Sequence, residues 1–307
     1  MKTHALYPLT LIAQYRDYIW GGHTIAERYN RAGTPTPCAE SWEISAVPGA
    51  ASVIAQGAFE GIALDRIVQT FGRDFLGSAA PDPERFPLLI KILDAQTRLS
   101  VQVHPDAPTA AALGGQPKHE MWYVLAARHG AQIYAGLTEG ATPETVVEHL
   151  AAHATSAGDV FDIPAGCVHA IDAGNLIYEV QQTSDTTYRL HDWGRGRELH
   201  LENALRSIHW ELTSHALHAQ SVPNHPITPR LVTPEFNFAT LDLTYERTLQ
   251  TTARSFMVLF CASGKTTLSH EGPHPLTLQA GDTVLLPAKS RVVLNPLAKT
   301  RLLMTTL

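Results

Sequence analysis

The chain has 307 residues, a hydrophobic fraction of 44%, a charged fraction of 17% and a formal net charge of -6 at pH 7. These values are typical of a globular protein of about two domains and exclude a disordered chain. A mildly acidic protein lacks the positive field that nucleic-acid binders use, and the apolar runs are too short for a transmembrane helix. We therefore expect neither a nucleic-acid nor a membrane partner.

Cysteine and histidine usage narrows the class further. Cys38, Cys167 and Cys261 are an odd number of widely spaced cysteines, which predicts a reducing compartment without a disulfide framework. The first residues, MKTHALYPLT, lack the apolar stretch of a signal peptide. We expect a cytoplasmic protein. The 16 histidines are more than the average protein has and make a metal site worth seeking.

Short strands separated by glycine and proline account for most of the sequence. The segment LSVQVH alternates, so Ser100, Gln102 and His104 lie on one face of a predicted strand. Aromatic and β-branched runs predict further strands at 120–126, 175–182, 255–264 and 282–288. Helical spacing predicts helices at 64–71 and 201–212, and the pair Thr142-Pro143 predicts the start of another that continues to about 150.

An internal repeat indicates how the chain is organised. AGDVFDIPAG (157–166) and AGDTVLLPAK (280–289) share a Gly-Asp turn, an apolar stretch and a Pro-Ala pair. Two such copies favour two related β units, each a small barrel. The proline-containing stretch 215–230 has little periodicity and is the expected linker.

The first copy continues into the pattern G-x5-P-x-G-x2-H, from Gly158 to His169. This pattern resembles the second motif of the cupin superfamily, whose small β-barrels hold a metal in the lumen. It departs from that motif at Ala173, where an asparagine is usual. The second copy is followed by Ser290, Arg291 and Val292, so only the first is expected to hold a metal in this way.

Three further residues complete a candidate metal site. Gln102 and His104 project from the same strand face, and Glu120 begins the next predicted strand. With His169 they form a mixed nitrogen and oxygen ligand set that leaves positions for water or substrate. A single histidine before a proline, such as His104, is more often a turn residue, but the four residues together favour a metal site.

Longer motifs bring the resemblance closer. The chain contains, in order, IWGG (19–22), ESWEIS (40–45), PLLIKILDAQTRLSVQVHPD (87–106), PKHEMWYVL (117–125), IPAGCVHAI (163–171) and YRLHDWGR (188–195). Over about residues 15–215 it is similar to the short bacterial type I mannose-6-phosphate isomerases. The resemblance implies a mainly β fold of two cupin-like (jelly-roll) barrels, with a few helices packed on the first. We expect a catalytic metal-binding domain at 1–220 and a C-terminal β domain without metal at 225–307.

The same resemblance implies the residues of the site. The zinc ligands map onto Gln102, His104, Glu120 and His169, with one Zn2+ per chain and Mn2+ or Co2+ as substitutes. Arg189 falls at the position of the family's catalytic arginine, and Lys118 and Lys91 match lysines of its pocket. His119 departs from the small residue or proline that is common next to the ligand glutamate.

The implied reaction interconverts mannose 6-phosphate and fructose 6-phosphate by proton transfer between C1 and C2 through a cis-enediolate. Arg189 and a divalent metal suit the negative charge that develops on the two oxygens. The sequence leaves the base open among Lys118, a carboxylate and a water on the metal. The phosphate needs cationic or hydroxyl donors, such as Ser100, Lys91 or Arg98.

Two other functions are compatible with the same residues. One is a different metal-dependent cupin enzyme, an oxygenase or epimerase; the other is a non-catalytic sugar-phosphate sensor. Arg189 and Lys118 favour an enzyme, because a sensor needs neither at the reacting carbons. The sequence sets neither the oligomeric state nor the strictness of sugar specificity.

Overall fold

A computed structural model describes residues 5–212, 216–217, 226–272 and 275–307. The chain divides into two compact units, each described by itself below. Unit 1 comprises 1–14, 42–88 and 220–307, and unit 2 comprises 15–41 and 89–219. The fold is mainly β, as predicted, and both units are built from antiparallel sheets. The assignment of metal binding to 1–220 alone stays a proposal.

Unit 2 contains a seven-stranded and a five-stranded sheet. The larger has the order β16 (Ala216–Leu217), β12 (Val160–Ile163), β9 (Glu120–Ala127), β14 (Asn175–Gln182), β7 (Leu88–Ala95), β3 (Glu40–Ile44) and β2 (Gln14–Arg16). The smaller has the order β11 (Leu150–Ala154), β10 (Gln132–Leu137), β13 (His169–Ile171), β8 (Val101–Val103) and β15 (Tyr188–His191).

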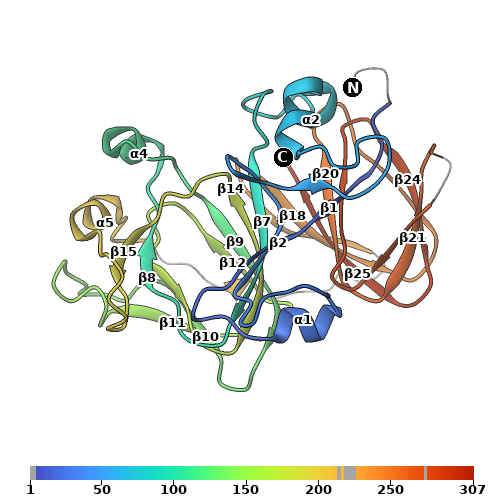
Figure 1. The fold of residues 1–307 in the computed structure, drawn as a ribbon. Helices are drawn as coiled ribbons and strands as arrows, with labels where there is room; N and C mark the ends of the chain where they lie inside the picture. Colours follow the sequence, from blue (N-terminus) through green and yellow to red (C-terminus); the bar gives the residue numbers. More distant parts are fainter. Residues whose placement is uncertain (1–4, 213–215, 218–225, 273–274) are drawn as a thin grey trace. The chain divides into compact units, whose positions relative to one another are not determined.

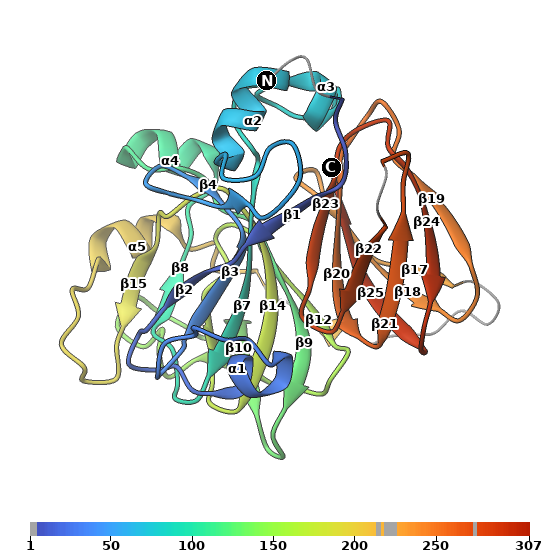
Figure 2. The same ribbon diagram turned by 45° about the vertical axis from the view of Figure 1, so that its right-hand side comes forward.

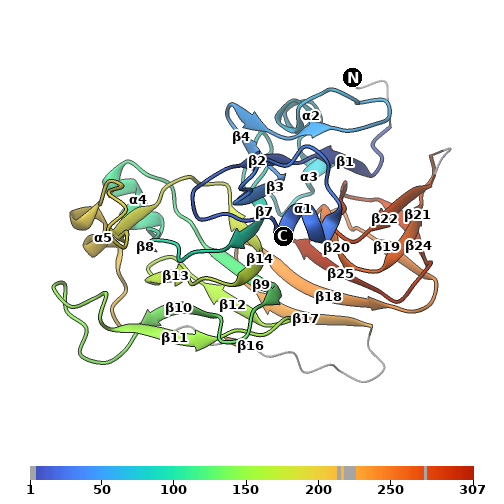
Figure 3. The same ribbon diagram turned by 60° about the horizontal axis from the view of Figure 1, so that its bottom comes forward.

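Two helices pack against one face of the five-stranded sheet: α4 (Ala107–Leu113) and α5 (Leu201–Ser207) lie near β8 in Figure 3, and Figure 1 shows β15 next to α5. Their apolar residues form one cluster with alternate residues of the strands, including Val101, Val103 and Ala204. Asp106 caps α4 by accepting from the Thr109 N–H at 2.8 Å, and Gly114 ends it in the left-handed conformation. The strand that carries Gln102 therefore buries its valines and leaves the glutamine on the opposite face. The third helix of unit 2 is α1 (Thr24–Tyr29).

Unit 1 is a second pair of sheets (Figure 2). One has the order β17 (Ile227–Val232), β18 (Asn237–Leu243), β25 (Thr300–Thr306), β20 (Met257–Ser263), β23 (Thr283–Leu286), β1 (Leu9–Ile12) and β6 (Val53–Ile54). The other has the order β19 (Arg247–Gln250), β24 (Arg291–Pro296), β21 (Lys265–Ser269) and β22 (Leu276–Gln279), and β4 (Ala46–Val47) pairs with β5 (Ala50–Ala51). Apolar side chains of both main sheets form a single buried cluster.

The two units are not consecutive along the chain, because unit 1 includes an N-terminal strand that completes its sheet. β1 pairs with β23 through Leu9 and Leu285 and with β6 on its other side. The short helices α2 (Leu64–Phe71) and α3 (Arg73–Leu76) also belong to this unit, and the Phe256 N–H donates to the Leu76 carbonyl. Residues 42–88 are thus part of the unit that contains the C-terminal strands.

Most of the predicted elements are present, with two differences among the helices. The prediction of a helix from Thr142 is wrong. The segment forms successive turns and then β11, which begins at Leu150. The helix predicted to reach residue 212 ends at Ser207, because the backbone becomes extended at Ile208 and the His209 N–H donates to the Gly166 carbonyl.

The predicted linker at 215–230 is only partly described. Its described parts are strands: β16 pairs with β12, and β17 lies at the edge of its sheet, where Pro229 is tolerated. Residues 215 and 218–225 lie outside the described residues. No helix within the described ranges is long and apolar enough to cross a bilayer. Cys38, Cys167 and Cys261 are buried thiols.

A close backbone approach in unit 1 generates a stability prediction. Gly77 has φ +88°, and a Cβ there would lie 2.4 Å from the Arg254 carbonyl oxygen. Gly61 has a similar φ of +78°, but a Cβ there would meet nothing within 4 Å. We expect Gly61→Ala to cost about 1 kcal/mol for the left-handed backbone alone and Gly77→Ala at least about 2 kcal/mol more. Thermal unfolding of the two variants checks this, and equal melting temperatures would contradict it.

Candidate functional site

A row of three polar side chains crosses the five-stranded sheet of unit 2. In the antiparallel register, His169 of β13 lies opposite Gln102 of β8, and Gln102 lies opposite Arg189 of β15. Their chain neighbours, such as Val101 and Val103, belong to the apolar cluster beneath the helices. Because side chains alternate along a strand, the polar row lies on the other face of the sheet.

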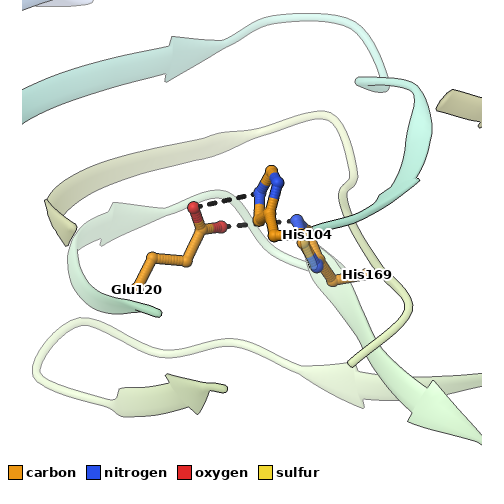
Figure 4. Close-up of side chains that lie close together, drawn as sticks. All are labelled: His104, Glu120 and His169. Atoms are coloured by element: carbon orange, nitrogen blue, oxygen red, sulfur yellow. Dashed lines mark ion pairs between the residues drawn. The ribbon is translucent and has the colours of Figure 1, made fainter. Parts of the chain in front are cut away.

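Glu120 approaches this row from the other sheet, at the start of β9. His104 follows directly after β8, and its Nε2 lies 3.2 Å from Glu120 Oε2. His169 Nε2 lies 3.3 Å from Glu120 Oε1. One ligand atom from each of the three residues falls within 4.8 Å of the others, and Figure 4 shows both rings beside the carboxylate. The structure thus brings together three of the four predicted metal ligands at ligand-atom range.

The histidine tautomers suit metal binding. His104 Nδ1 lies 3.0 Å from the Thr186 carbonyl oxygen, and His169 Nδ1 lies 2.9 Å from the Cys167 carbonyl oxygen. A carbonyl accepts a hydrogen bond, so each ring carries its proton on Nδ1 and directs the Nε2 lone pair towards Glu120. The backbone of two loops therefore orients both rings.

Burial and nearby charge keep these groups in their ligand forms. Burial, with Lys118 nearby, lowers the pKa of His104 to about 3, and burial also lowers the pKa of His169. For Glu120, burial acts to raise the pKa, but the charge of the nearby Lys118 ammonium outweighs it and holds the pKa well below its usual range. Two neutral imidazoles and one carboxylate result.

Unsatisfied polar atoms indicate that a cation fits here. His104 Nε2 and both carboxylate oxygens of Glu120 are buried and make no hydrogen bond of normal geometry. The Lys118 ammonium, 2.9 Å from Oε2, compensates part of this charge, but leaving buried polar atoms without a hydrogen bond is costly in a protein interior. The amide nitrogen of Gln102 lies 3.2 Å from His169 Nε2, and turning the amide over puts its oxygen there as a fourth ligand. The residues present therefore fit a divalent metal.

The metal cluster adjoins a cavity of about 430 Å³ within unit 2. It is lined by the remaining predicted site residues, which are Lys91, Ser100, Gln102, Lys118 and Arg189. Lys118 Nζ lies 2.9 Å from Glu120 Oε2 and so connects the cavity to the cluster. His119, the departure from the family pattern, lies 2.6 Å from Asp162 and joins the start of β9 to β12.

Arg98, named in the sequence analysis as a phosphate donor, does not line this cavity. Its guanidinium donates two hydrogen bonds to Asp172, at 2.8 and 2.7 Å, and lies 4.5 Å from the ring centroid of Trp193. The Trp193 indole donates in turn to the Leu99 carbonyl at 2.7 Å. Arg98 therefore anchors the loop after β15 to the chain before β8.

That loop places a second arginine at the cavity. Arg197 lines the cavity and donates from Nε to Asp192 at 3.0 Å and from Nη2 to the other oxygen of the same carboxylate. Arg195 donates to Asp192 as well, at 2.8 Å. Asp192 is only 4% exposed. Within the described residues, Arg197 Nη1 and Arg189 Nε make no hydrogen bond, so both can donate to a ligand.

Several cavity residues were missed by the sequence analysis. They include Glu40, Trp122, Glu179, Asp185 and Arg197. A signal existed for Glu179, which interrupts the apolar run NLIYEVQQ as Lys91 interrupts PLLIKIL. Glu43 of ESWEIS, by contrast, accepts from Thr283 at 3.0 Å inside unit 1 and does not line the cavity.

The chain is similar to known proteins over most of its length. Residues 9–138 match the family model for the catalytic domain of type I phosphomannose isomerase. The mannose-6-phosphate isomerase of Streptococcus mutans is 34% identical over 298 residues, covering 91% of this chain and 92% of that protein. The crystal structure of the Bacillus subtilis enzyme superposes with a TM-score of 0.87 at 27% identity, covering 97% and 99% of the two chains.

A second similar structure is a mannose 6-phosphate isomerase bound with zinc and yttrium. It superposes with a TM-score of 0.77 at 18% identity, covering 97% of this chain and 98% of that one. At this identity the likeness concerns the fold.

The metal cluster predicts the effect of removing its one carboxylate. We expect Glu120→Gln to lower the affinity for a divalent metal at least about a hundredfold, because an anionic ligand is lost. The purified variant should contain less than about a tenth of the metal of the unaltered protein, measured by elemental analysis. Glu202→Gln, on the exposed surface of α5, is the control and should retain its metal. Equal metal content in all three proteins contradicts the assignment.

Asp192 predicts a pH-dependent stability. Hydrogen bonding from Arg197, with the charges of Arg197 and Arg195, outweighs burial and lowers the pKa of Asp192 from 3.8 to about 2. A depressed pKa stabilises the folded state above the unfolded value, and the contribution is lost as pH falls from about 4 to 2. We expect Asp192→Asn to cost about 2 kcal/mol at pH 7, with the difference shrinking below pH 4. Denaturant unfolding at pH 7 and below pH 4 measures the loss of stability, with the exposed Asp17→Asn as control. A loss that is the same at both pH values rules out the ion pair as its cause.

Proposed function

The chain belongs to the type I phosphomannose isomerases, and on that basis we propose that it interconverts mannose 6-phosphate and fructose 6-phosphate at the cavity of unit 2, with a divalent metal. The observation that carries the proposal is the convergence of His104, Glu120 and His169 beside that cavity. A sugar phosphate suits it in size and polarity, since such sites are usually between 300 and 1,000 Å³.

We propose that Gln102, His104, Glu120 and His169 hold one Zn2+. Zinc accepts imidazole and carboxylate ligands, and a structurally similar mannose 6-phosphate isomerase binds zinc. Mn2+ and Co2+ suit the same ligands and are proposed as substitutes. When bound, the ion acts as a Lewis acid that stabilises negative charge on the substrate oxygens. The C-terminal strands of unit 1 enclose an apolar cluster, which supports a metal site in unit 2 alone.

Arg189 is proposed to stabilise the enediolate. Its guanidinium stays charged at any working pH, and the Arg189 Nη1 donates to the Glu198 carbonyl at 2.6 Å, which fixes its direction. The unpaired Nε is a donor at the cavity wall, where it can meet the oxygens at C1 and C2 as they gain charge. Held in place before the reaction, it loses little energy to reorganisation.

One base is proposed to remove the proton from C2 of mannose 6-phosphate and return it to C1. Two side chains lining the cavity are candidates: Lys118, held against Glu120, and the exposed carboxylate of Asp185. Lys91 and Ser100 are proposed to bind the substrate, and both are buried in the cavity wall. Their placement on strands orients the sugar chain relative to the reacting carbons.

Removing the metal tests this function. Purified protein should convert mannose 6-phosphate to fructose 6-phosphate, and thorough chelation should lower the rate at least about a hundredfold. One equivalent of Zn2+ should restore the rate, whereas Mg2+ should not, because it prefers an octahedral set of oxygens. Undiminished turnover by metal-free protein defeats the proposal. Substrate binding without turnover identifies a sensor, and substrate-linked oxygen uptake identifies an oxygenase.

A further inference from the structure

A second row of side chains lines the cavity from the seven-stranded sheet. It consists of Trp122, Glu179, Lys91 and Glu40, one from each of the adjacent strands β9, β14, β7 and β3. Trp122 lies directly opposite Glu179 in the register, and its indole donates to Glu179 Oε1 at 3.0 Å. Lys91 Nζ lies 3.0 Å from Glu179 Oε2 and 3.9 Å from Glu40 Oε2.

Carboxyl groups outnumber the ammonium in this row, although burial raises the pKa of Glu179. One ammonium stands against two carboxylates, and the side chains of Glu40, Lys91 and Glu179 are only 12%, 11% and 6% exposed. Burial acts to lower the pKa of Lys91, but the attraction of Glu179 and Glu40 outweighs it and raises that pKa. Lys91 is therefore charged, and its charge is already compensated within the row.

The other charged residues of the cavity wall have the opposite balance. They are three cations, Lys118, Arg189 and Arg197, and one carboxylate, Asp185. Lys118 is paired with Glu120. Arg195 and Arg197 share the single carboxylate of Asp192, so together they keep one net positive charge. The Arg197 side chain is 37% exposed, against 7% for Lys118, and Asp192 fixes its orientation while leaving Nη1 to donate. A phosphate dianion is attracted to this side and repelled by the two carboxylates of the row.

We propose that the sugar phosphate binds in one orientation, with its phosphate on Arg197 and its hydroxyl groups on the row of Glu40, Lys91 and Glu179. This inference rests on the proposed function, and it assigns Lys91 to the hydroxyls instead of the phosphate. Hydroxyl groups both donate and accept, so they match alternating carboxylates and ammonium. Buried polar groups of this kind discriminate strongly against ligands that lack the matching hydroxyls. The row is therefore the part of the site that selects the sugar.

Binding measurements separate the two sides of the cavity. The ligands are mannose 6-phosphate and inorganic phosphate, titrated calorimetrically into metal-loaded protein. The charge-balanced variant Lys91→Met/Glu179→Gln should weaken mannose 6-phosphate binding at least about tenfold and leave inorganic phosphate binding within about twofold. Arg197→Gln should weaken both ligands at least about tenfold. A merely structural role of the row would alter both affinities together.

Opposite results overturn the assignment. If the double variant loses inorganic phosphate binding to the same extent as mannose 6-phosphate binding, Lys91 binds the phosphate. If Arg197→Gln retains inorganic phosphate binding, the phosphate lies elsewhere. Should the double variant fail to fold, Glu40→Gln replaces it, with the same expected selectivity. These binding measurements need no turnover. A protein that binds both ligands but is inactive contradicts the proposed function, while the variants still test the binding orientation.

Discussion

The candidate site of unit 2 depends on one electrostatic constraint, which is the buried carboxylate of Glu120. Its two oxygens are within reach of two imidazoles and one ammonium, yet neither makes a normal hydrogen bond. A carboxylate in such a place is stable only with compensating positive charge. Lys118 supplies part of it, and both histidines are kept neutral by burial. The proposed divalent ion would supply the remaining positive charge, so the same carboxylate links the ligand geometry to the proposed chemistry.

The buried charge of the site reduces the apolar packing of unit 2 relative to unit 1. Between the main sheets of unit 1, leucine, valine and methionine side chains form one continuous cluster. In unit 2 the apolar cluster around Phe161 and Ile177 fills only part of the interior, and the polar rows and the cavity occupy the rest. Apolar contacts with α4 and α5 on the outer face of the five-stranded sheet offset that loss. The helices thus support the strands whose inner face carries the site.

The sequence was sufficient for features that depend on local periodicity. Alternation in LSVQVH placed Gln102 on the face opposite Val101 and Val103, and the strand confirms it. Leu99 departs from the pattern because β8 begins only at Val101, and this leucine lines the cavity instead. Long-range pairing could not be read locally. Nothing near Leu9 indicates that it pairs with Leu285, and nothing near Glu40 indicates that it approaches Lys91.

The same limit explains why the sequence offers Lys91, beside Ser100 and Arg98, as a possible phosphate donor. A lysine in an apolar run reads as an isolated cation, since its compensating carboxylates come from two other strands. Glu40 and Glu179 compensate most of its charge, which supports its proposed assignment to the hydroxyl groups of the sugar. Arg197 shows the reverse, because its loop position gives no hint that Asp192 fixes its orientation. The electrostatic role of a residue in this barrel follows from its cross-strand neighbours, and residue type alone is a poor guide to it.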